Sequence, residues 1–257
     1  MNYNILFSCV SHIGRRRSMN QDNFICNGQY IASEEDSIKF PLEGCMTVHA
    51  PLFFGVFDGM GGEECGEIAS LIAAQQAAKT VIGKHPTDDF LKYCTEANEK
   101  ICQYAQDHDI GSMGTTAAML AFAKSGIVLC NIGDSKIFHF SEGVMEQISL
   151  DHVVLSAYGT KPPLSQNLGI PSDELLIEPY IACGKYHPED IYLICSDGLT
   201  DMVKSDEIEE VLADMPFEKV TQTLLDKALV NGGRDNITII VCKIKRKTGW
   251  LKKLLRK

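Results

Sequence analysis

The chain has 257 residues, of which 45% are hydrophobic and 23% charged, as expected of a globular protein that buries a sizeable core. Its 34 acidic and 24 basic residues give a net charge of −10, which argues against nucleic acid as the main partner. No stretch approaches the ~20 apolar residues of a membrane span, and the N-terminus lacks a secretory signal pattern, so we expect a cytoplasmic protein.

The first half of the chain predicts three strands, a polar loop and two helices. The strands are expected over 5–13, 24–31 and 47–57, and the loop over 33–45. Apolar residues at helical spacing predict a helix over 63–82. A second helix is expected to begin near Pro86, with Thr87 as its N-cap.

The second half predicts seven further strands and two helices. The first four strands are separated by short polar turns and are expected to form an antiparallel meander, over 117–123, 127–132, 136–140 and 144–150. Residues 151–171 are irregular. The elements expected after them are strands over 175–183, 190–195 and 237–244, and helices over 206–213 and 217–229.

The stretch from Phe53 to Gly62 has an unusual composition. A short apolar strand ends in Asp58, and glycines follow at positions 59, 61 and 62. Glycine just after a strand lets the backbone turn sharply and approach a ligand closely. A carboxylate at such a turn is well placed to hold a cation, although a single Asp-Gly pair would be read as an ordinary turn.

Aspartates recur at strand ends elsewhere in the chain. The main set consists of Asp22, Asp58, Asp197 and Asp235. Two further candidates are Asp134, at a turn, and Asp201, which shares a helical face with Asp197 if that segment is helical. Clustered carboxylates raise one another's pKa unless a cation neutralises them. Oxygen ligands without associated histidine or cysteine favour Mg²⁺ or Mn²⁺ over Zn²⁺.

The ordered motifs of the chain resemble the metal-dependent protein serine/threonine phosphatases of the phosphatase 2C type (PPM), in their bacterial form. The motifs that carry the resemblance are Arg17–Asp22, Val56–Gly62, Gly66–Glu67, Met113–Thr116, Asn131–Ser135, Asp151–His152, Cys195–Asp201 and Gly232–Thr238. Each is weak alone, but together they follow the family order over nearly the whole chain.

The resemblance implies an α+β fold, a four-layer α-β-β-α sandwich of two antiparallel sheets flanked by helix pairs. It also implies a centre of two Mg²⁺ or Mn²⁺ ions. Asp58 would bridge the ions, the Gly59 carbonyl would be a ligand, and Asp22, Asp197 and Asp235 would complete the set. A possible third ion would use Asp134 and Asp201 with Asp197. Gln21 and Asn236 would lie in the layer of residues around the ligands, without binding the ions directly.

The implied mechanism is hydrolysis of phosphoserine and phosphothreonine by a hydroxide that bridges the two cations. Arg17 matches the phosphate-binding arginine of the family. Its planar guanidinium can engage two phosphate oxygens, which lysine could not reproduce. Arg15 and Arg16 are expected to be surface charges.

Three departures from the family pattern bear on activity. Gln21 stands where glutamate is usual, which predicts at most a weaker metal affinity. Met60 stands where other members have a histidine proposed as general acid, so the proton donor is open. The flap at 153–170 is short, which leaves the substrate preference open.

Residues 1–245 are expected to form one catalytic domain, followed by a basic amphipathic tail at 246–257. Residues 243–257 hold eight basic and no acidic residues, and the remainder carries a net charge of −18. Residues 248–257 can form a basic amphipathic helix on an anionic membrane surface. A frayed, solvated terminus is the competing interpretation.

Three classes of function remain open from the sequence. The favoured one is an active phosphatase, expected to be a monomer, that opposes a serine/threonine kinase. The second is a partner-switching regulatory phosphatase for one small phosphoprotein. The third is a catalytically weak scaffold that binds phosphoproteins, against which the complete set of aspartates and Arg17 argues.

Ten dispersed cysteines without a Cys-x-x-Cys pair predict reduced thiols.

Overall fold

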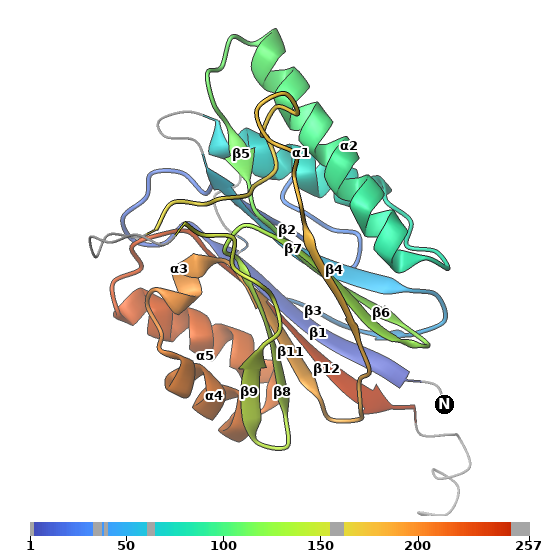
Figure 1. Cartoon of the computed structure of the whole chain (residues 1–257). Helices are drawn as coiled ribbons and strands as arrows, with labels where there is room; N and C mark the ends of the chain where they lie inside the picture. Colours follow the sequence, from blue (N-terminus) through green and yellow to red (C-terminus); the bar gives the residue numbers. More distant parts are fainter. Residues whose placement is uncertain (1–2, 33–37, 39–40, 61–64, 155–161, 248–257) are drawn as a thin grey trace, which may run out of the picture.

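Two antiparallel sheets pack face to face, and helices cover the outer side of each (Figure 1). The computed structural model describes residues 3–32, 38, 41–60, 65–154 and 162–247. This four-layer arrangement confirms the predicted α+β sandwich. The predicted membrane contact through residues 248–257 lies outside the described residues. In the described part of the chain, no helix is long and apolar enough to cross a bilayer.

The first sheet contains both ends of the described chain. Its strands, in spatial order, are β3 (Leu42–Thr47), β1 (Tyr3–His12), β12 (Ile237–Arg246), β11 (Ile191–Cys195), β8 (Lys136–Ser141) and β9 (Val144–Gln147). Side chains of β12 alternate between the two faces of the sheet, as the strand period of two requires. Ile240 and Cys242 lie in the core between the sheets, whereas Ile239 and Val241 pack under the helices.

The second sheet holds the Asp58 stretch. Its strands, in spatial order, are β10 (Tyr180–Gly184), β7 (Gly126–Ile132), β6 (Ala117–Ala123), β4 (Leu52–Met60) and β2 (Asp22–Ile25), with β5 (Gly114–Thr115) paired to the end of β4. Every residue of β6 and β7 is buried, because the first sheet covers one face and helices cover the other.

Two groups of helices form the outer layers. Helices α1 (Gly66–Lys79) and α2 (Pro86–Asp107) cover the second sheet. Helices α4 (Ser205–Asp214) and α5 (Phe217–Val230) cover the first sheet, together with the short α3 (Asp197–Thr200). The helix pairs outside each sheet therefore agree with the layering implied by the sequence.

The predicted four-stranded meander is wrong. Strands β6 and β7 form a hairpin in the second sheet, whereas β8 and β9 form a hairpin in the first. The chain changes sheets at residues 133–135, where Gly133 has a φ of +98°. A Cβ on Gly133 would lie 2.6 Å from the side chain of Thr116, the residue before β6. Only glycine therefore lets the crossing segment pass this close to Thr116.

Four element boundaries also differ from the predictions. The loop expected over 33–45 contains most of β3, an edge strand. Its side chains are all at least partly exposed, so its sequence has no continuous apolar run. The strand expected over 24–31 ends at Ile25, because a tight turn joins Cys26 to Gln29. Helix α2 begins at Pro86 with His85 as N-cap, so Thr87 is not the cap. The strand expected over 175–183 begins only at Tyr180, after a turn at Pro171.

All ten cysteines are free thiols, as predicted. Cys94 of α2 and Cys130 of β7 approach each other with their sulfurs 3.6 Å apart in the core. They pack as small apolar side chains between helix and sheet.

Candidate metal centre

Asp22 and Asp58 lie opposite each other on neighbouring antiparallel strands. Asp22 is the first residue of β2, and Asp58 is its register partner in β4. Residues directly opposite in an antiparallel pair project to the same face of the sheet, where like charges destabilise each other. The fold therefore imposes close contact on two acidic side chains that are far apart in the sequence.

Asp22 is almost completely buried, with 3% of its surface exposed. Its Oδ2 accepts a hydrogen bond of 2.7 Å from the hydroxyl of Ser196, whereas its buried Oδ1 has no hydrogen-bond partner among the described residues. Burial raises the pKa of Asp22 to about 6, although the hydrogen bond from Ser196 opposes the shift. The nearby charge of Asp235 contributes to this rise.

The backbone of Asp58 is fixed by two threonines. The N–H of Thr116 and the hydroxyl of Thr115 both donate to the Asp58 carbonyl, at 2.9 and 3.0 Å. The Asp58 N–H in turn donates to the Thr116 hydroxyl at 3.0 Å. With both peptide groups held, the Asp58 carboxylate starts from a rigid position. These threonines belong to a motif noted in the sequence, but their role was not foreseen.

Gly59 lies where three segments of backbone meet. Its N–H donates to the carbonyl of Gln21 at 3.0 Å. A Cβ on Gly59 would lie 2.1 Å from the Gly66 carbonyl oxygen and 2.4 Å from that of Gln21. Only glycine allows β4, α1 and the segment before β2 to approach so closely. The side chain of Gln21 also contacts α1, where its Nε2 donates to Glu67 at 3.4 Å.

Asp235 is held on two sides. Its Oδ2 accepts a hydrogen bond of 2.7 Å from the guanidinium of Arg17, although the two residues are 218 positions apart. Its Oδ1 accepts from the backbone N–H of Asn236 at 2.8 Å. The ion pair is partly exposed, with 49% of the Arg17 and 30% of the Asp235 side chain accessible. The predicted phosphate-binding arginine and a predicted metal ligand are therefore direct neighbours.

Asn236 fixes the segment that carries Arg17 and Gln21. Its amide nitrogen donates to the carbonyls of Ile13 and Met19, both at 2.9 Å. Its amide oxygen accepts from the Gln21 N–H at 2.8 Å. Because Asn236 is 4% exposed, these hydrogen bonds are protected from water. Asn236 therefore clamps residues 13–21, whereas its support of metal ligands stays a prediction.

Asp197 begins the short helix α3 and is 5% exposed. The next residue, Gly198, lies against Asn236: a Cβ there would be 1.9 Å from the Asn236 carbonyl oxygen. The Asp201 N–H donates to the Asp197 carbonyl at 2.8 Å, so this segment is helical, as the shared face with Asp201 requires. Asp201 is exposed and Asp134 is buried.

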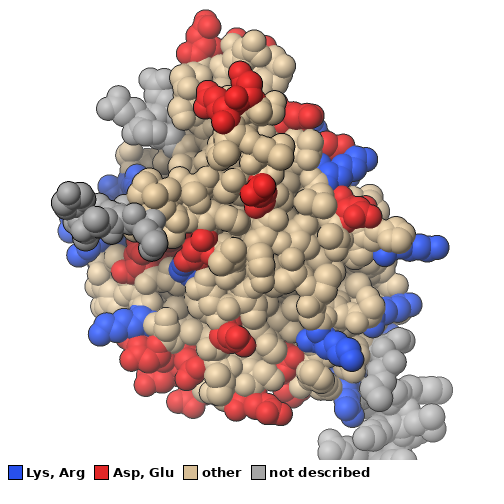
Figure 2. All heavy atoms as spheres, viewed as in Figure 1, with Lys and Arg blue, Asp and Glu red and all other residues tan. Residues whose placement is uncertain are grey.

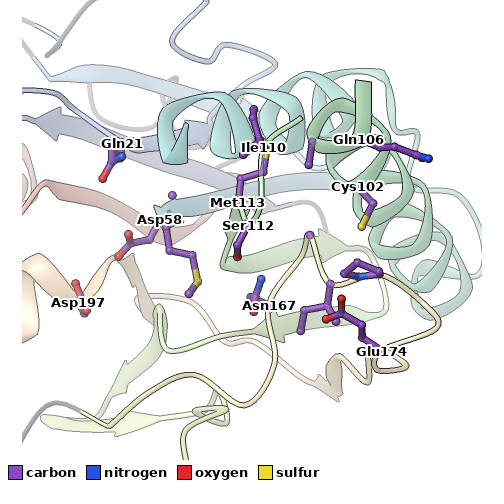
Figure 3. Close-up of a pocket in the computed structure, with 18 of the residues that line it drawn as sticks. Gln21, Asp58, Cys102, Gln106, Ile110, Ser112, Met113, Asn167, Glu174 and Asp197 are labelled. Atoms are coloured by element: carbon purple, nitrogen blue, oxygen red, sulfur yellow. The ribbon is translucent and has the colours of Figure 1, made fainter. Parts of the chain in front are cut away.

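A cavity of about 850 Å³ opens above these residues. Three of the predicted carboxylates line it, namely Asp58, Asp197 and Asp235. Arg17, Gln21, Gly59 and Met60 line it as well. Asp134 and Asp201 are not among the described lining residues, so their third-ion role stays a prediction. Figure 3 shows Asp58 and Asp197 together at one end of the cavity.

The donor set fits a hard divalent cation. All the side-chain donors are oxygens, and the unpartnered Oδ1 of Asp22 is a buried acceptor that a cation would satisfy. Within the described residues, however, no three acidic, histidine or cysteine side chains are already arranged as a complete metal-ligand group. The ion pair between Arg17 and Asp235 occupies one candidate ligand in this arrangement.

Comparison with known proteins relates this chain to one family. The family model described as "Protein phosphatase 2C" matches residues 33–231. The "Serine/threonine phosphatase stp" of Listeria innocua is 30% identical over 206 residues, which span 72% of this chain and 82% of that protein.

Solved structures give the same picture. The Mycobacterium tuberculosis serine/threonine phosphatase PstP/Ppp superposes with a TM-score of 0.78 at 23% identity, covering 94% of this chain and all of the other. A structure of the PstP catalytic domain "in complex with 2 Manganese ions" superposes with a TM-score of 0.76 at 25% identity, covering 95% of this chain and all of the other. These likenesses extend over both sheets and both outer helix layers.

Proposed function

The chain belongs to the protein phosphatase 2C family and is a serine/threonine protein phosphatase, and on this premise we propose that two divalent cations, Mg²⁺ or Mn²⁺, are required for its hydrolysis of phosphoserine and phosphothreonine. The observation that carries the proposal is the opposition of Asp22 and Asp58 beneath a cavity that Arg17 also lines. Such a pair, with Asp22 buried and Asp58 partly exposed, is tolerable at neutral pH only with a proton or a cation between them.

The residues proposed to hold the cations are Asp22, Asp58, Asp197 and Asp235, with the carbonyl of Gly59. Bound cations of this type neutralise the carboxylates and lower the pKa of a coordinated water, which supplies a nucleophile near neutral pH. The complex of the related PstP domain with two manganese ions supports the number and kind of cations. Asp134 and Asp201 are proposed for a third, weaker position.

Arg17 is proposed to bind the phosphate group of the substrate. Its guanidinium lies at the cavity and is about half exposed, so it can donate to phosphate oxygens while it remains close to Asp235. The clamp that Asn236 makes on residues 13–21 fixes the start of this arginine's segment. Arg17 thus orients the phosphorus toward the aspartates that are proposed to hold the cations.

Protonation of the leaving serine or threonine oxygen does not involve Met60. This residue is 37% exposed at the cavity, but its thioether has no proton to donate. We assign the proton to a water molecule in the open cavity. The proposal therefore differs from a mechanism in which a side chain at position 60 acts as general acid.

Hydrolysis of a phosphothreonine peptide tests the proposal. Phosphate release should require added Mn²⁺ or Mg²⁺ and should stop when a chelator is added in excess. The matched phosphotyrosine peptide should be hydrolysed much more slowly. Turnover that persists undiminished in chelator would contradict the metal-dependent mechanism, whereas complete inactivity with either metal would favour a phosphoprotein-binding scaffold.

A further inference from the structure

The cavity extends well beyond the proposed catalytic residues. From Met60 it continues between the C-terminal end of α2 with the loop after it and the segment 167–174. Figure 3 shows Asp58 and Asp197 at one end, Cys102 and Glu174 at the other, and Met113 and Asn167 between them. We call this extension the distal groove; its described lining consists of residues 102, 105–106, 110–114, 167, 169–171 and 173–174.

The wall formed by residues 167–171 is held rigidly. Buried Asn98 of α2 accepts hydrogen bonds from the N–H groups of Gly169 and Ile170, at 2.7 and 3.1 Å. Its amide nitrogen donates to the Ile170 carbonyl at 2.9 Å. Leu168 exchanges two backbone hydrogen bonds of 2.9 Å with Thr115, whose hydroxyl also holds the Asp58 carbonyl. Thr115 therefore connects this wall to β4, the strand that carries Asp58.

Gly169 completes this attachment. Its φ of +108° is accessible mainly to glycine, and a Cβ there would lie 2.3 Å from the Met113 carbonyl oxygen. The two walls of the distal groove therefore approach each other closely at Gly169. A preformed wall loses little conformational entropy when a ligand binds.

The distal groove has an apolar middle and an acidic end. Ile110, Met113, Ile170 and Pro171 contribute apolar surface. Asp173 and Glu174 follow, both exposed, in a turn where the Glu174 N–H donates to the Pro171 carbonyl at 3.0 Å. Cys102 lines the same side of the groove. Burial chiefly raises the pKa of its thiol, and the charges of Glu174 and Asp173 add to the rise.

Acidic side chains line both ends of the cavity, whereas positive charge lies at one end only among the described lining residues. Arg17, at the catalytic end, is the only lysine or arginine among the described lining residues. No described cation forms an ion pair with Asp173 or Glu174 at the other end. Figure 2 shows acidic side chains gathered at the end of the molecule where α2 ends. A substrate that places its phosphate at Arg17 therefore meets uncompensated negative charge farther along.

We propose that the distal groove binds the substrate polypeptide beside its phosphorylated residue, and that Asp173 and Glu174 select a lysine or arginine side chain there. The inference rests on the proposed function, because the phosphate at Arg17 fixes where the chain enters. An extended chain advances about 3.3 Å per residue, so a peptide that runs along the groove places each successive residue farther from the phosphothreonine. The apolar middle accommodates the residues in between.

A lysine scan measures the proposed selection. The substrates are phosphothreonine peptides that differ only in one lysine or one glutamate, placed in turn at each position on both sides of the phosphothreonine. At one or two adjacent positions on one side, wild type should show a kcat/KM for the lysine peptide about three- to tenfold above that for the glutamate peptide, as expected for exposed charge pairs. The ratio should fall as salt is raised.

Two double variants test whether Asp173 and Glu174 cause this preference for lysine. In the variant Asp173→Asn/Glu174→Gln, the lysine-to-glutamate ratio should fall to about one at these positions. The control Glu210→Gln/Asp214→Asn makes the same charge change on exposed residues of α4, on the other side of the sandwich, and should keep the wild-type ratio. A ratio that is equal in all three proteins, or that falls equally in both variants, would overturn the proposal.

Failure of this inference differs from failure of the proposed function. Hydrolysis of p-nitrophenyl phosphate with Mn²⁺ reports the catalytic end alone, because this substrate is too short to extend along the groove. Fluorescence anisotropy of the labelled peptides reports groove binding without turnover. Tighter binding of the lysine peptide by wild type than by Asp173→Asn/Glu174→Gln supports the groove even in an inactive enzyme. Equal binding overturns it even in an active one.

Discussion

Asp22 of β2 lies directly opposite Asp58 of β4 in an antiparallel strand pair. The Oδ1 atom of Asp22 is buried without a hydrogen-bond partner among the described residues. The sheet register creates this pair, and register is difficult to change because a shift of one residue would turn every side chain of β2 to the other face. The fold therefore holds two carboxylates close together, and a divalent cation between them would neutralise their repulsion.

The variant Asp22→Asn should stabilise the metal-free protein in a pH-dependent way. The pKa of Asp22 rises from 3.8 to about 6 on folding, so the folded state keeps a proton that the unfolded state loses between these pH values. The free energy of unfolding therefore falls as pH rises through this window and stays lower above pH 6. In chelator, urea unfolding should find the variant more stable by about 3 kcal/mol near pH 7.5 and equal to wild type near pH 4.

Added Mn²⁺ should reverse this order near pH 7.5, because wild type gains binding free energy that the variant lacks. A variant that is less stable than wild type in chelator at both pH values would show that the Asp22 charge is already compensated within the protein.

Gly59→Ala should damage both stability and activity. The new Cβ would lie 2.1 Å from the Gly66 carbonyl oxygen, so β4 and α1 must separate, at about 1–3 kcal/mol in the free energy of unfolding. The separation also displaces the Gly59 carbonyl, and phosphatase activity should fall with Mn²⁺ affinity. Gly83→Ala is the matched control, because its nearest described neighbour is 3.5 Å away. Equal behaviour of the two variants in urea unfolding would contradict this account.

Arg17→Lys should show whether the guanidinium fork is needed. Lysine keeps the charge but loses the paired donors, so kcat/KM for a phosphothreonine peptide should fall about tenfold, mainly through KM; Arg17→Ala should lose about 100-fold. Arg16→Ala is the control, because Arg16 is exposed and does not line the described cavity. If Arg17→Lys retained the wild-type KM, the phosphate-binding role would be wrong.

The sequence indicated the family and the sandwich because its motifs are local and ordered along the chain. Asp58 before Gly59, and Asp197 before Gly198, are each recognisable within a few residues. The layering was implied by the family resemblance, and the apolar periodicities, which report burial locally, agree with it. The ligand roles of these aspartates stay predictions, but the structure brings Asp58, Asp197 and Asp235 to one cavity.

Features that depend on distant parts of the chain could not be read in this way. The crossing at Gly133 looks like a hairpin turn in the sequence, because only the position of the other sheet distinguishes the two. Asn98 looks like an ordinary polar residue of a helix, yet its hydrogen-bond partners lie 71 and 72 positions away. The hydroxyl of Ser196 contacts Asp22 across 174 positions. Such contacts have no local pattern, so only the folded structure reveals them.

Calorimetric titration of Mn²⁺ tests the central claim most directly, because it counts bound ions without requiring turnover. We expect two ions per chain for wild type near pH 7.5, and at most one weakly bound ion for Asp58→Asn, in which a carboxylate proposed to hold both ions is replaced by a neutral amide. Asp206→Asn, a change at an exposed residue of α4, should bind as wild type does. Absence of Mn²⁺ binding by wild type, or an unchanged titration of Asp58→Asn, would contradict a cation centre built on the Asp22–Asp58 pair.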